Sequence, residues 1–315
     1  MDKIKGSVLI GVAIFGLFIS FNSQAQFRQL PIPSQPVSEA DGSTYHLKTA
    51  DEVLQLPFWD DFSSGECSEL LWEAQGVNAS FTTGISAPSL GVVVFDGVDE
   101  TGQPYSSTRL EEGEGDQLLS KPIDLTATSN TYLSFYWQAG GKAERPDDSD
   151  ALELYFLDAV GNWELVWSQG GEADLPTDDF VQEVLPVEDK FLHEGFQFKF
   201  QQSGRISGPF DSWILDYIYL NKDRSIIDRF PEDRAITQVP SSPFAPYFSI
   251  PYFEITEDKI TGPISSEFNN LANRFRAMEY TVSLSNIATG ELLDKPNTNT
   301  PFNPVPQALE RRAFS

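Results

Sequence analysis

Apolar and polar residues alternate with a period of two through much of the central part of this chain. In the segment 196–201 every phenylalanine is followed by a glutamine or a lysine, and the segments 133–138 and 152–156 show similar alternation. A period of two places successive side chains on opposite faces of a strand, so these segments predict half-buried β-strands. Further strands are expected at residues 91–95, 163–167, 180–187 and 213–220.

Turn-forming residues separate the predicted strands. They stand at positions 96–97, 140–141, 161–162, 170–171 and 207–209. Short, evenly spaced strands without any stretch of helical period predict an all-β domain, and in particular a jelly-roll β-sandwich. The fold class predicted for the whole chain is therefore a jelly-roll β-sandwich followed by a proline-rich connector and a partial immunoglobulin-like β region.

The first residues have the pattern of an export signal. Lys3 and Lys5 precede an apolar run at 8–19, and small residues follow at positions 23 and 25. A basic start, a short apolar core and a small-residue cleavage site predict a signal peptide over residues 1–25. We therefore expect a protein exported across the inner membrane, and secreted or located at the cell surface.

The remaining chain divides into four segments. Residues 26–56 contain three prolines and no sustained period, which predicts an extended N-terminal arm, and residues 57–222 carry the predicted sandwich. Prolines cluster again in residues 223–263, which we interpret as a connector. Residues 264–315 are expected to form a partial β domain or a tail, with a hairpin at 279–293. This last region is either an appendage or the start of a further domain.

The charge balance excludes some partners and favours others. Asp and Glu number 47 against 21 Lys and Arg, so the formal net charge is −26. Such a field repels phosphate backbones and excludes nucleic acid as a partner, whereas carboxylates are the ligands of calcium.

Cys67 is the only cysteine, so the chain forms no internal disulfide. A reactive pair of Cys67 with His193 is one reading, and a half-buried free cysteine is the favoured one.

The strand at 213–220 is apolar on both faces, which predicts a central strand with Asp216 buried. Strict alternation places Ile214, Asp216, Ile218 and Leu220 on one face, and Trp213, Leu215, Tyr217 and Tyr219 on the other. A buried carboxylate needs either a cation or hydrogen-bond donors. Asp60 and Asp61 would lie beside Asp216 if the first and last strands pair, and Asp211 precedes the last strand. These four are candidate calcium ligands, with hydrogen bonding by protein groups as the alternative.

Two further acidic clusters are candidates for a calcium site and for a pair of glycosidase carboxylates. Asp96 and Asp99 lie on a glycine-bounded loop that fits either a calcium site or an ordinary Asx turn. Asp148, Asp150 and Glu153 precede or enter a strand, and two carboxylates are what a glycosidase requires. Alternation puts Glu153 on the opposite face from Asp150, so an acidic loop entering a strand is the favoured interpretation.

Aromatic and acidic residues open and close the predicted sandwich, at 57–62 and 213–218. These segments resemble the ends of the MAM domain, an extracellular adhesion sandwich, with Tyr217 where a second acid would be expected. Residues 57–220 more closely resemble the jelly-roll domain of exported bacterial surface proteins found with type IX secretion. The matching pieces are 57–62, 95–99, 119–125, 132–138 and 195–200. The resemblance implies surface exposure and a sandwich, but no single activity.

We therefore expect a non-enzymatic exported module for binding, adhesion or structure, with a calcium-stabilised edge and a surface protein or glycan as partner. One alternative is a carbohydrate-binding ancillary region of a longer surface hydrolase, and another is a component of an outer-membrane assembly related to type IX secretion. Trp59, Trp72 and Tyr105 are candidates for stacking on sugar rings. Glycan binding would require a row of aromatic residues on one face of the sandwich.

Overall fold

The computed structural model describes residues 53–315 except 173–174, 176 and 261. The predicted signal peptide and nearly all of the predicted arm lie outside the described residues. The helices in the described part of the chain are the short 3-10 turns η1 (Asp189–Phe191), η2 (Tyr252–Glu254) and η3 (Glu257–Lys259). None of the described helices has the length and apolar character that a membrane crossing requires.

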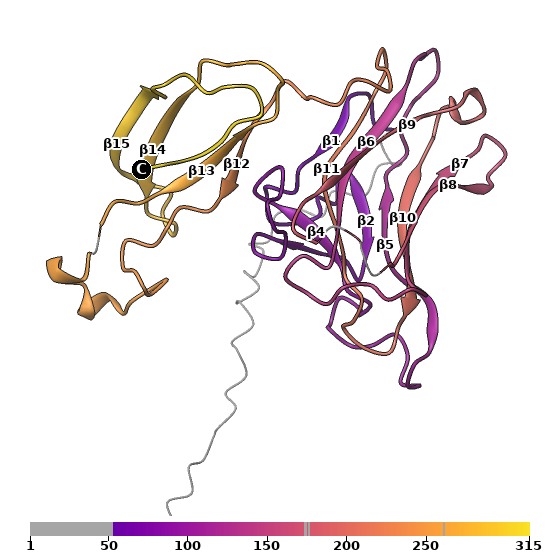
Figure 1. The fold of residues 1–315 in the computed structure, drawn as a ribbon, viewed down its shortest axis with the longest axis horizontal. Helices are drawn as coiled ribbons and strands as arrows, with labels where there is room; N and C mark the ends of the chain where they lie inside the picture. Colours follow the sequence, from indigo (N-terminus) through magenta and orange to yellow (C-terminus); the bar gives the residue numbers. More distant parts are fainter. Residues whose placement is uncertain (1–52, 173–174, 176, 261) are drawn as a thin grey trace, which may run out of the picture. The chain divides into compact units, whose positions relative to one another are not determined.

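Two antiparallel sheets form a β-sandwich (Figure 1). The first sheet contains β1 (Phe58–Asp60), β3 (Asn78–Ser80), β4 (Val92–Phe95), β6 (Tyr132–Ala139), β9 (Val181–Pro186) and β11 (Trp213–Asn221). Its order is β3-β4-β11-β6-β9, with β1 also paired to β11. The second sheet contains β2 (Trp72–Gln75), β5 (Glu112–Ser120), β7 (Ala151–Leu157), β8 (Trp163–Gly170) and β10 (Phe198–Arg205). Its order is β2-β5-β10-β7-β8.

The strand order confirms the jelly roll. The strands from β4 to β11 divide into β4-β11-β6-β9 in one sheet and β5-β10-β7-β8 in the other. This arrangement of eight strands is produced by two interlocked Greek keys, which define the jelly-roll architecture. Apart from the hairpins β3–β4 and β7–β8, the strands of the sandwich therefore pair with neighbours distant in sequence, and loops that are far apart along the chain meet at the ends of the sandwich.

The core between the sheets is rich in aromatic side chains, because the alternating residues of both sheets point into it. The ring of Phe198 lies 5.3 Å from that of Phe58 and 5.6 Å from that of Trp72, measured between centroids. Both contacts are edge-to-face, the geometry that aromatic quadrupoles favour. Phe198 and Phe200 are fully buried, as the alternation at 196–201 predicts.

A bulge in β11 changes which residues of that strand face the core. The register of β11 against β6 shifts between Asp216 and Tyr219, and Tyr217 has a φ of 50°. The core cluster therefore contains Trp213, Leu215, Ile218 and Leu220 together. The strict alternation predicted for this strand is wrong, because one extra residue at a bulge exchanges the two faces beyond it. Tyr219 then lies opposite Trp59 of β1, on the outer face of the sheet.

Two smaller sheets follow along the chain. Their strands are β12 (Arg234–Gln238), β13 (Ser266–Asn270), β14 (Glu279–Ser285), β15 (Leu292–Pro301) and β16 (Arg311–Phe314). β14 and β15 pair as the hairpin that the sequence predicts, and β12-β13-β16 form a three-stranded sheet. β12 lies within the range 223–263, for which the sequence predicts only a connector, and its pairing partner β13 lies beyond that range.

Candidate cation site and aromatic groove

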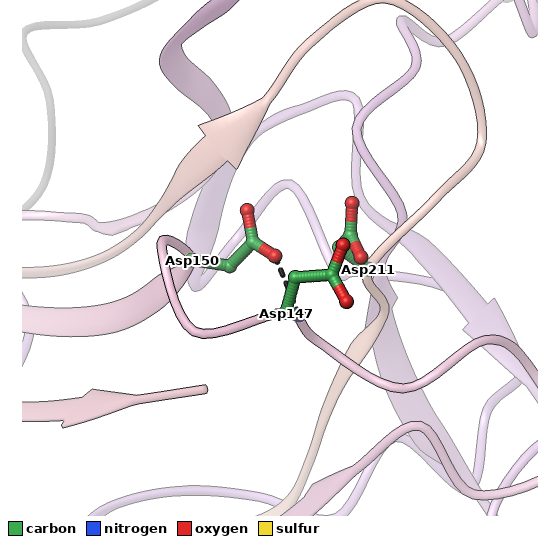
Figure 2. A group of neighbouring side chains, drawn as sticks. All are labelled: Asp147, Asp150 and Asp211. Carbon is green, nitrogen blue, oxygen red and sulfur yellow. Dashed lines mark hydrogen bonds between the residues drawn. The ribbon is translucent and has the colours of Figure 1, made fainter. Parts of the chain in front are cut away.

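Three aspartates from two loops meet at one end of the sandwich. Asp147 and Asp150 lie between β6 and β7, and Asp211 lies between β10 and β11. The loops are neighbours because β11 pairs with β6 at Trp213 and Ala139, and β10 pairs with β7. Each aspartate contributes one carboxylate oxygen to a set in which all oxygens lie within 4.8 Å of one another (Figure 2).

Two backbone amides hold the carboxylate of Asp150. The amide of Asp147 donates to Oδ2 of Asp150 at 2.7 Å, and the amide of Arg205 donates to Oδ1 of Asp150 at 3.1 Å. The Asp150 side chain is therefore held at the start of β7, while the Asp147 side chain is 72% exposed. Asp150 is buried by contrast, so one side of the cluster faces solvent and the other faces the protein interior.

Asp211 is the most constrained member of the cluster. It has a φ of 62°, and its carbonyl accepts a hydrogen bond from Nε2 of Gln202 at 3.0 Å. Its side chain is only 1% exposed, and its Oδ2 lies 3.2 Å from Nη2 of Arg205. Its Oδ1 has no hydrogen-bond partner among the residues that the structure describes. A buried anionic oxygen without a donor costs about 1–3 kcal/mol or more.

Burial and mutual repulsion perturb the ionisation of these carboxyls. Burial, followed by the neighbouring charge of Asp150, raises the pKa of Asp211 to about 6, although Arg205 opposes the rise. Burial also raises the pKa of Asp150. Both shifts mean that the charged forms are under-compensated by protein groups. The three carboxylates form a set that could hold a metal ion.

The sequence singles out Asp211 and Asp150 but assigns them to different sites, and it omits Asp147. The sequence signal that could have indicated Asp147 is the acidic run 147–150, in which it is the first residue. Their meeting requires the pairing of β7 with β10, which no local pattern specifies. Within the described part of the chain, this is the only set of three or more His, Cys, Asp or Glu ligands that is close enough to bind one ion.

Asp216 is buried on central strand β11, as predicted, and β1 pairs with β11 as expected for the first and last strands. Its Oδ2 accepts the amide of Ser89 and its Oδ1 accepts the Ser89 hydroxyl, each at 2.8 Å. Burial raises the pKa of Asp216 to about 8. The geometry thus realises the alternative in which protein donors compensate this carboxyl, and calcium at Asp216 stays a prediction.

Asp60 at the end of β1 and Asp61 directly after it also accept hydrogen bonds from the protein. Oδ1 of Asp60 accepts the amide of Phe62 at 2.9 Å, and Oδ2 accepts Nε1 of Trp72 at 2.7 Å. Burial raises the pKa of Asp60. Asp61 accepts the amide of Ser63 at 3.1 Å. These contacts place both acids near the start of the sandwich without gathering them into a set of metal ligands with Asp216.

The loop after β4 has the geometry of an Asx turn. Oδ1 of Asp99 accepts the amides of Thr101 and Gln103 at 2.8 and 2.9 Å. Asp96 accepts the amide of Val98 at 3.3 Å. These bonds correspond to the turn that the sequence leaves open beside calcium, and calcium at Asp96 and Asp99 also stays a prediction.

The base of the same loop depends on Asp116, an acid that stands in no sequence motif. Oδ2 of buried Asp116 in β5 accepts the amides of Asp96 and Gly97, and Oδ1 accepts the hydroxyl of Tyr105 at 2.8 Å. Burial raises the pKa of Asp116 to about 6. Tyr105 is half-buried and its hydroxyl is tied to Asp116, and stacking of its ring on a sugar stays a prediction.

The residues considered for catalysis each make separate structural contacts. Burial raises the pKa of the Cys67 thiol to about 12, so the thiolate is suppressed. The ring nitrogens of His193 lie 2.9 and 3.0 Å from the carbonyl oxygens of Glu194 and Leu157. Glu153 accepts the hydroxyl of Tyr155 on the outer face of β7, whereas Asp150 is buried before that strand.

An aromatic groove lies on the outer face of the first sheet. It has a volume of about 460 Å³, and its aromatic walls are Trp59, Tyr217, Tyr219 and Phe230. Trp59 and Phe230 are 43% and 42% exposed. The Trp59 and Tyr217 rings lie 5.8 Å apart, edge to face. The prediction that Trp72 stacks on a sugar ring is wrong, because Trp72 is only 2% exposed and packs in the core.

The segment after β11 forms one wall of the groove and is anchored by Arg224. The guanidinium of Arg224 donates to the carbonyls of Tyr132 and Tyr219 at 3.1 and 2.9 Å, and to Asp228 at 2.8 Å. It also lies over the ring of Tyr219 at 4.5 Å. The carboxylates of Asp228, Glu232 and Asp233 line the same groove. The groove thus combines aromatic faces with hydrogen-bond acceptors.

No family model matches the sequence, and no curated protein matches it. Solved structures with a similar fold include TmCBM61 in complex with β-1,4-galactotriose, at 14% identity over 52% of this chain and 94% of that chain, with a TM-score of 0.33. The K1 cleaved adhesin domain of Lys-gingipain from Porphyromonas gingivalis W83 is 14% identical over 53% and 99%, with a TM-score of 0.36. CBM27-1 of Caldicellulosiruptor saccharolyticus, in complex with mannohexaose, is 13% identical over 54% and 98%, with a TM-score of 0.36.

Proposed function

We propose that this chain is an exported, non-catalytic module that binds a neutral glycan in the aromatic groove of its first sheet. The observation that carries the proposal is the pair of exposed rings of Trp59 and Phe230 on one outer face, beside half-buried Tyr219 and buried Tyr217. Aromatic rings gathered on one face are what stacking on a sugar chain needs. Export rests on the basic, apolar and small-residue pattern of residues 1–25.

The chemistry of the groove suits a sugar ring. The face of an aromatic ring is electron-rich, so it attracts the polarised C–H groups on one side of a pyranose. Asp228, Glu232 and Asp233 supply carboxylate oxygens that can accept hydrogen bonds from sugar hydroxyls. A groove of about 460 Å³ falls in the range of small-molecule sites, which combine apolar walls with a few polar groups.

The bulge in β11 explains why the groove exists. Without the extra residue, Tyr219 would point into the core and Ile218 would lie outside. The bulge places Tyr219 on the same face as Trp59, its partner in the β1–β11 register. Bulges often occur where a strand must redirect a side chain towards a binding surface.

Charge narrows the ligand class. The formal net charge of −26 repels acidic polysaccharides, although in the groove itself Arg224 pairs with Asp228, and Arg274 and Arg276 pair with Glu232. The proposed ligand is therefore a neutral glycan. A non-catalytic role is supported by the suppressed Cys67 thiolate and by the separation of Asp150 from Glu153 across the strand.

Affinity electrophoresis tests the proposal with gels that contain neutral galactan, mannan or xylan, and with an acidic polysaccharide for comparison. We expect at least one neutral polysaccharide to retard the protein. Trp59→Ala should weaken this binding by about tenfold or more, because truncating a central aromatic anchor costs at least about 1.4 kcal/mol. Trp163→Ala is the matched control, since Trp163 is 37% exposed on β8 of the other sheet.

Two results would contradict the proposal. If none of the neutral polysaccharides retards the protein, the groove is not a glycan site for these polymers. If Trp163→Ala abolishes retardation and Trp59→Ala does not, the glycan binds the opposite sheet, and the assignment to the groove is wrong.

A further inference from the structure

The charges around Asp211 do not balance within the described residues. Asp147, Asp150 and Asp211 bring three carboxylates together, and Arg205 is the cation that contacts them. Arg205 lies 3.2 Å from Oδ2 of Asp211 and 3.9 Å from Oδ2 of Asp147. When the three acids are ionised, the cluster carries two excess negative charges, which is the charge that one divalent cation neutralises.

A second observation points to a ligand at the same place. Oδ1 of Asp211 is buried and has no hydrogen-bond partner among the described residues, although Oδ2 of the same carboxylate is paired with Arg205. The carboxylates of Asp147 and Asp150 converge on that of Asp211 (Figure 2). Buried polar atoms are nearly always satisfied in native proteins, so an orphaned anionic oxygen among carboxylates calls for a cation or a proton.

We propose that Asp147, Asp150 and Asp211 bind a calcium ion that joins the β6–β7 loop to the β10–β11 loop. Asp211 contributes its orphaned Oδ1, while Oδ2 keeps its contact with Arg205. Asp150 contributes an oxygen that already accepts one amide, because a carboxylate oxygen has capacity for a second partner. Asp147 closes the site from the solvent side, and water supplies the remaining ligands.

The donor set favours calcium over other common cations. The ligands are all oxygen, without the thiolate or imidazole that zinc prefers. They come from two loops and leave one side open to solvent, since the Asp147 side chain is 72% exposed. Calcium accepts six to eight oxygens in irregular geometry, whereas magnesium demands a near-ideal octahedron.

This inference goes beyond glycan binding, because the cation site and the aromatic groove share no residue. We expect the bound ion to stabilise the fold. The strand β7 begins at Ala151 and β11 at Trp213, so an ion at the cluster ties the starts of strands from the two sheets together. Calcium should therefore raise the thermal midpoint of the protein by mass action, because the unfolded chain lacks the assembled site.

Isothermal titration of calcium chloride into chelator-treated full-length protein tests the site. We expect one calcium to bind per chain, with a dissociation constant at or below the millimolar range of extracellular modules. Asp147→Asn should weaken binding at least about tenfold, because it removes one of three charged ligands. Asp147 is exposed, so this variant keeps the fold, and its thermal midpoint in chelator should equal that of the unmodified protein. Asp148→Asn is the matched control, since it removes the same charge from the exposed adjacent residue.

The proposal is overturned if no calcium binds up to about 10 mM. It is also overturned if Asp147→Asn and Asp148→Asn bind calcium equally, or if Asp61→Asn and Asp216→Asn abolish binding while Asp147→Asn does not. The last result would place the ion near β1 and β11. Affinity electrophoresis with Trp59→Ala reports on the glycan groove separately, so either proposal can fail without the other.

Discussion

Replacing Asp216 by asparagine should remove a large part of the pH dependence of stability. The Asp216 carboxyl is fully buried on β11, and both of its oxygens accept hydrogen bonds from Ser89. Burial raises its pKa from the ordinary value of 3.8 to about 8 in the folded protein. Between these two values the folded protein holds a proton that the unfolded chain releases.

The sign and size of the effect follow from this difference. The favourable contribution is complete below pH 3.8 and is lost as the pH rises through about 8. Within this window the free energy of unfolding falls by about 1.4 kcal/mol per pH unit, on the order of 5 kcal/mol in total. Asparagine at this position can accept the Ser89 amide and donate to the Ser89 hydroxyl, so the fold is kept while the titration is removed.

Urea unfolding between pH 5 and 8, followed by tryptophan fluorescence in the presence of chelator, measures the effect. The free energy of unfolding of the unmodified protein should fall more steeply with pH than that of Asp216→Asn, by up to about 1.4 kcal/mol per pH unit. Asp148→Asn serves as the control, because this exposed acid should leave the slope unchanged.

Parallel curves for the unmodified protein and Asp216→Asn would refute this reasoning. In chelator, they would mean that the folded protein keeps Asp216 ionised with its charge compensated by hydrogen-bond donors such as Ser89 alone. The calcium hypothesis for this residue makes the opposite prediction to ours. Under it, calcium raises the thermal midpoint of the unmodified protein, and Asp216→Asn abolishes the rise.

Two further predictions concern the core and the wall of the groove. Phe198→Ala should reduce the free energy of unfolding by about 3–5 kcal/mol, because the ring is fully buried against Phe58 and Trp72; a loss below about 1 kcal/mol in urea unfolding would contradict this packing. Arg224→Met should cost roughly 2–5 kcal/mol and speed hydrogen exchange of residues 222–233, since the guanidinium anchors that segment. Unchanged exchange there would show that other contacts hold the wall of the groove.

The fold class could be predicted from local pattern because burial acts on each strand separately. The alternation at 196–201 and 152–156 marks strands whose alternate side chains enter a core, and β10 and β7 follow that pattern. Strand β5 could not be found this way. Its sequence, Glu112–Ser120, begins with acids and glycines, and it is a strand because β2 and β10 supply partners on both sides.

The same limit applies to the faces of β11. Residue period predicts that Asp216 is buried on a central strand, and the structure agrees. Period alone cannot locate a bulge, because the extra residue is set by pairing with β6 rather than by the side chains of the strand. That single residue decides that Tyr219 lies outside with Trp59, and so decides where the proposed glycan groove lies.

By itself, the sequence determined the all-β class, the acidic charge that favours hard cations, and the pool of candidate carboxylates and aromatics. Only the tertiary structure decided which of them meet. Asp150 and Asp211 are distant in sequence, and the pairing of β7 with β10 brings their loops together. Asp60 and Asp216 lie on paired strands, yet their oxygens are held by Trp72 and Ser89. Composition determines which side chains are available for binding. Strand pairing determines the distances between those side chains, and a binding site forms only where the distances are short enough.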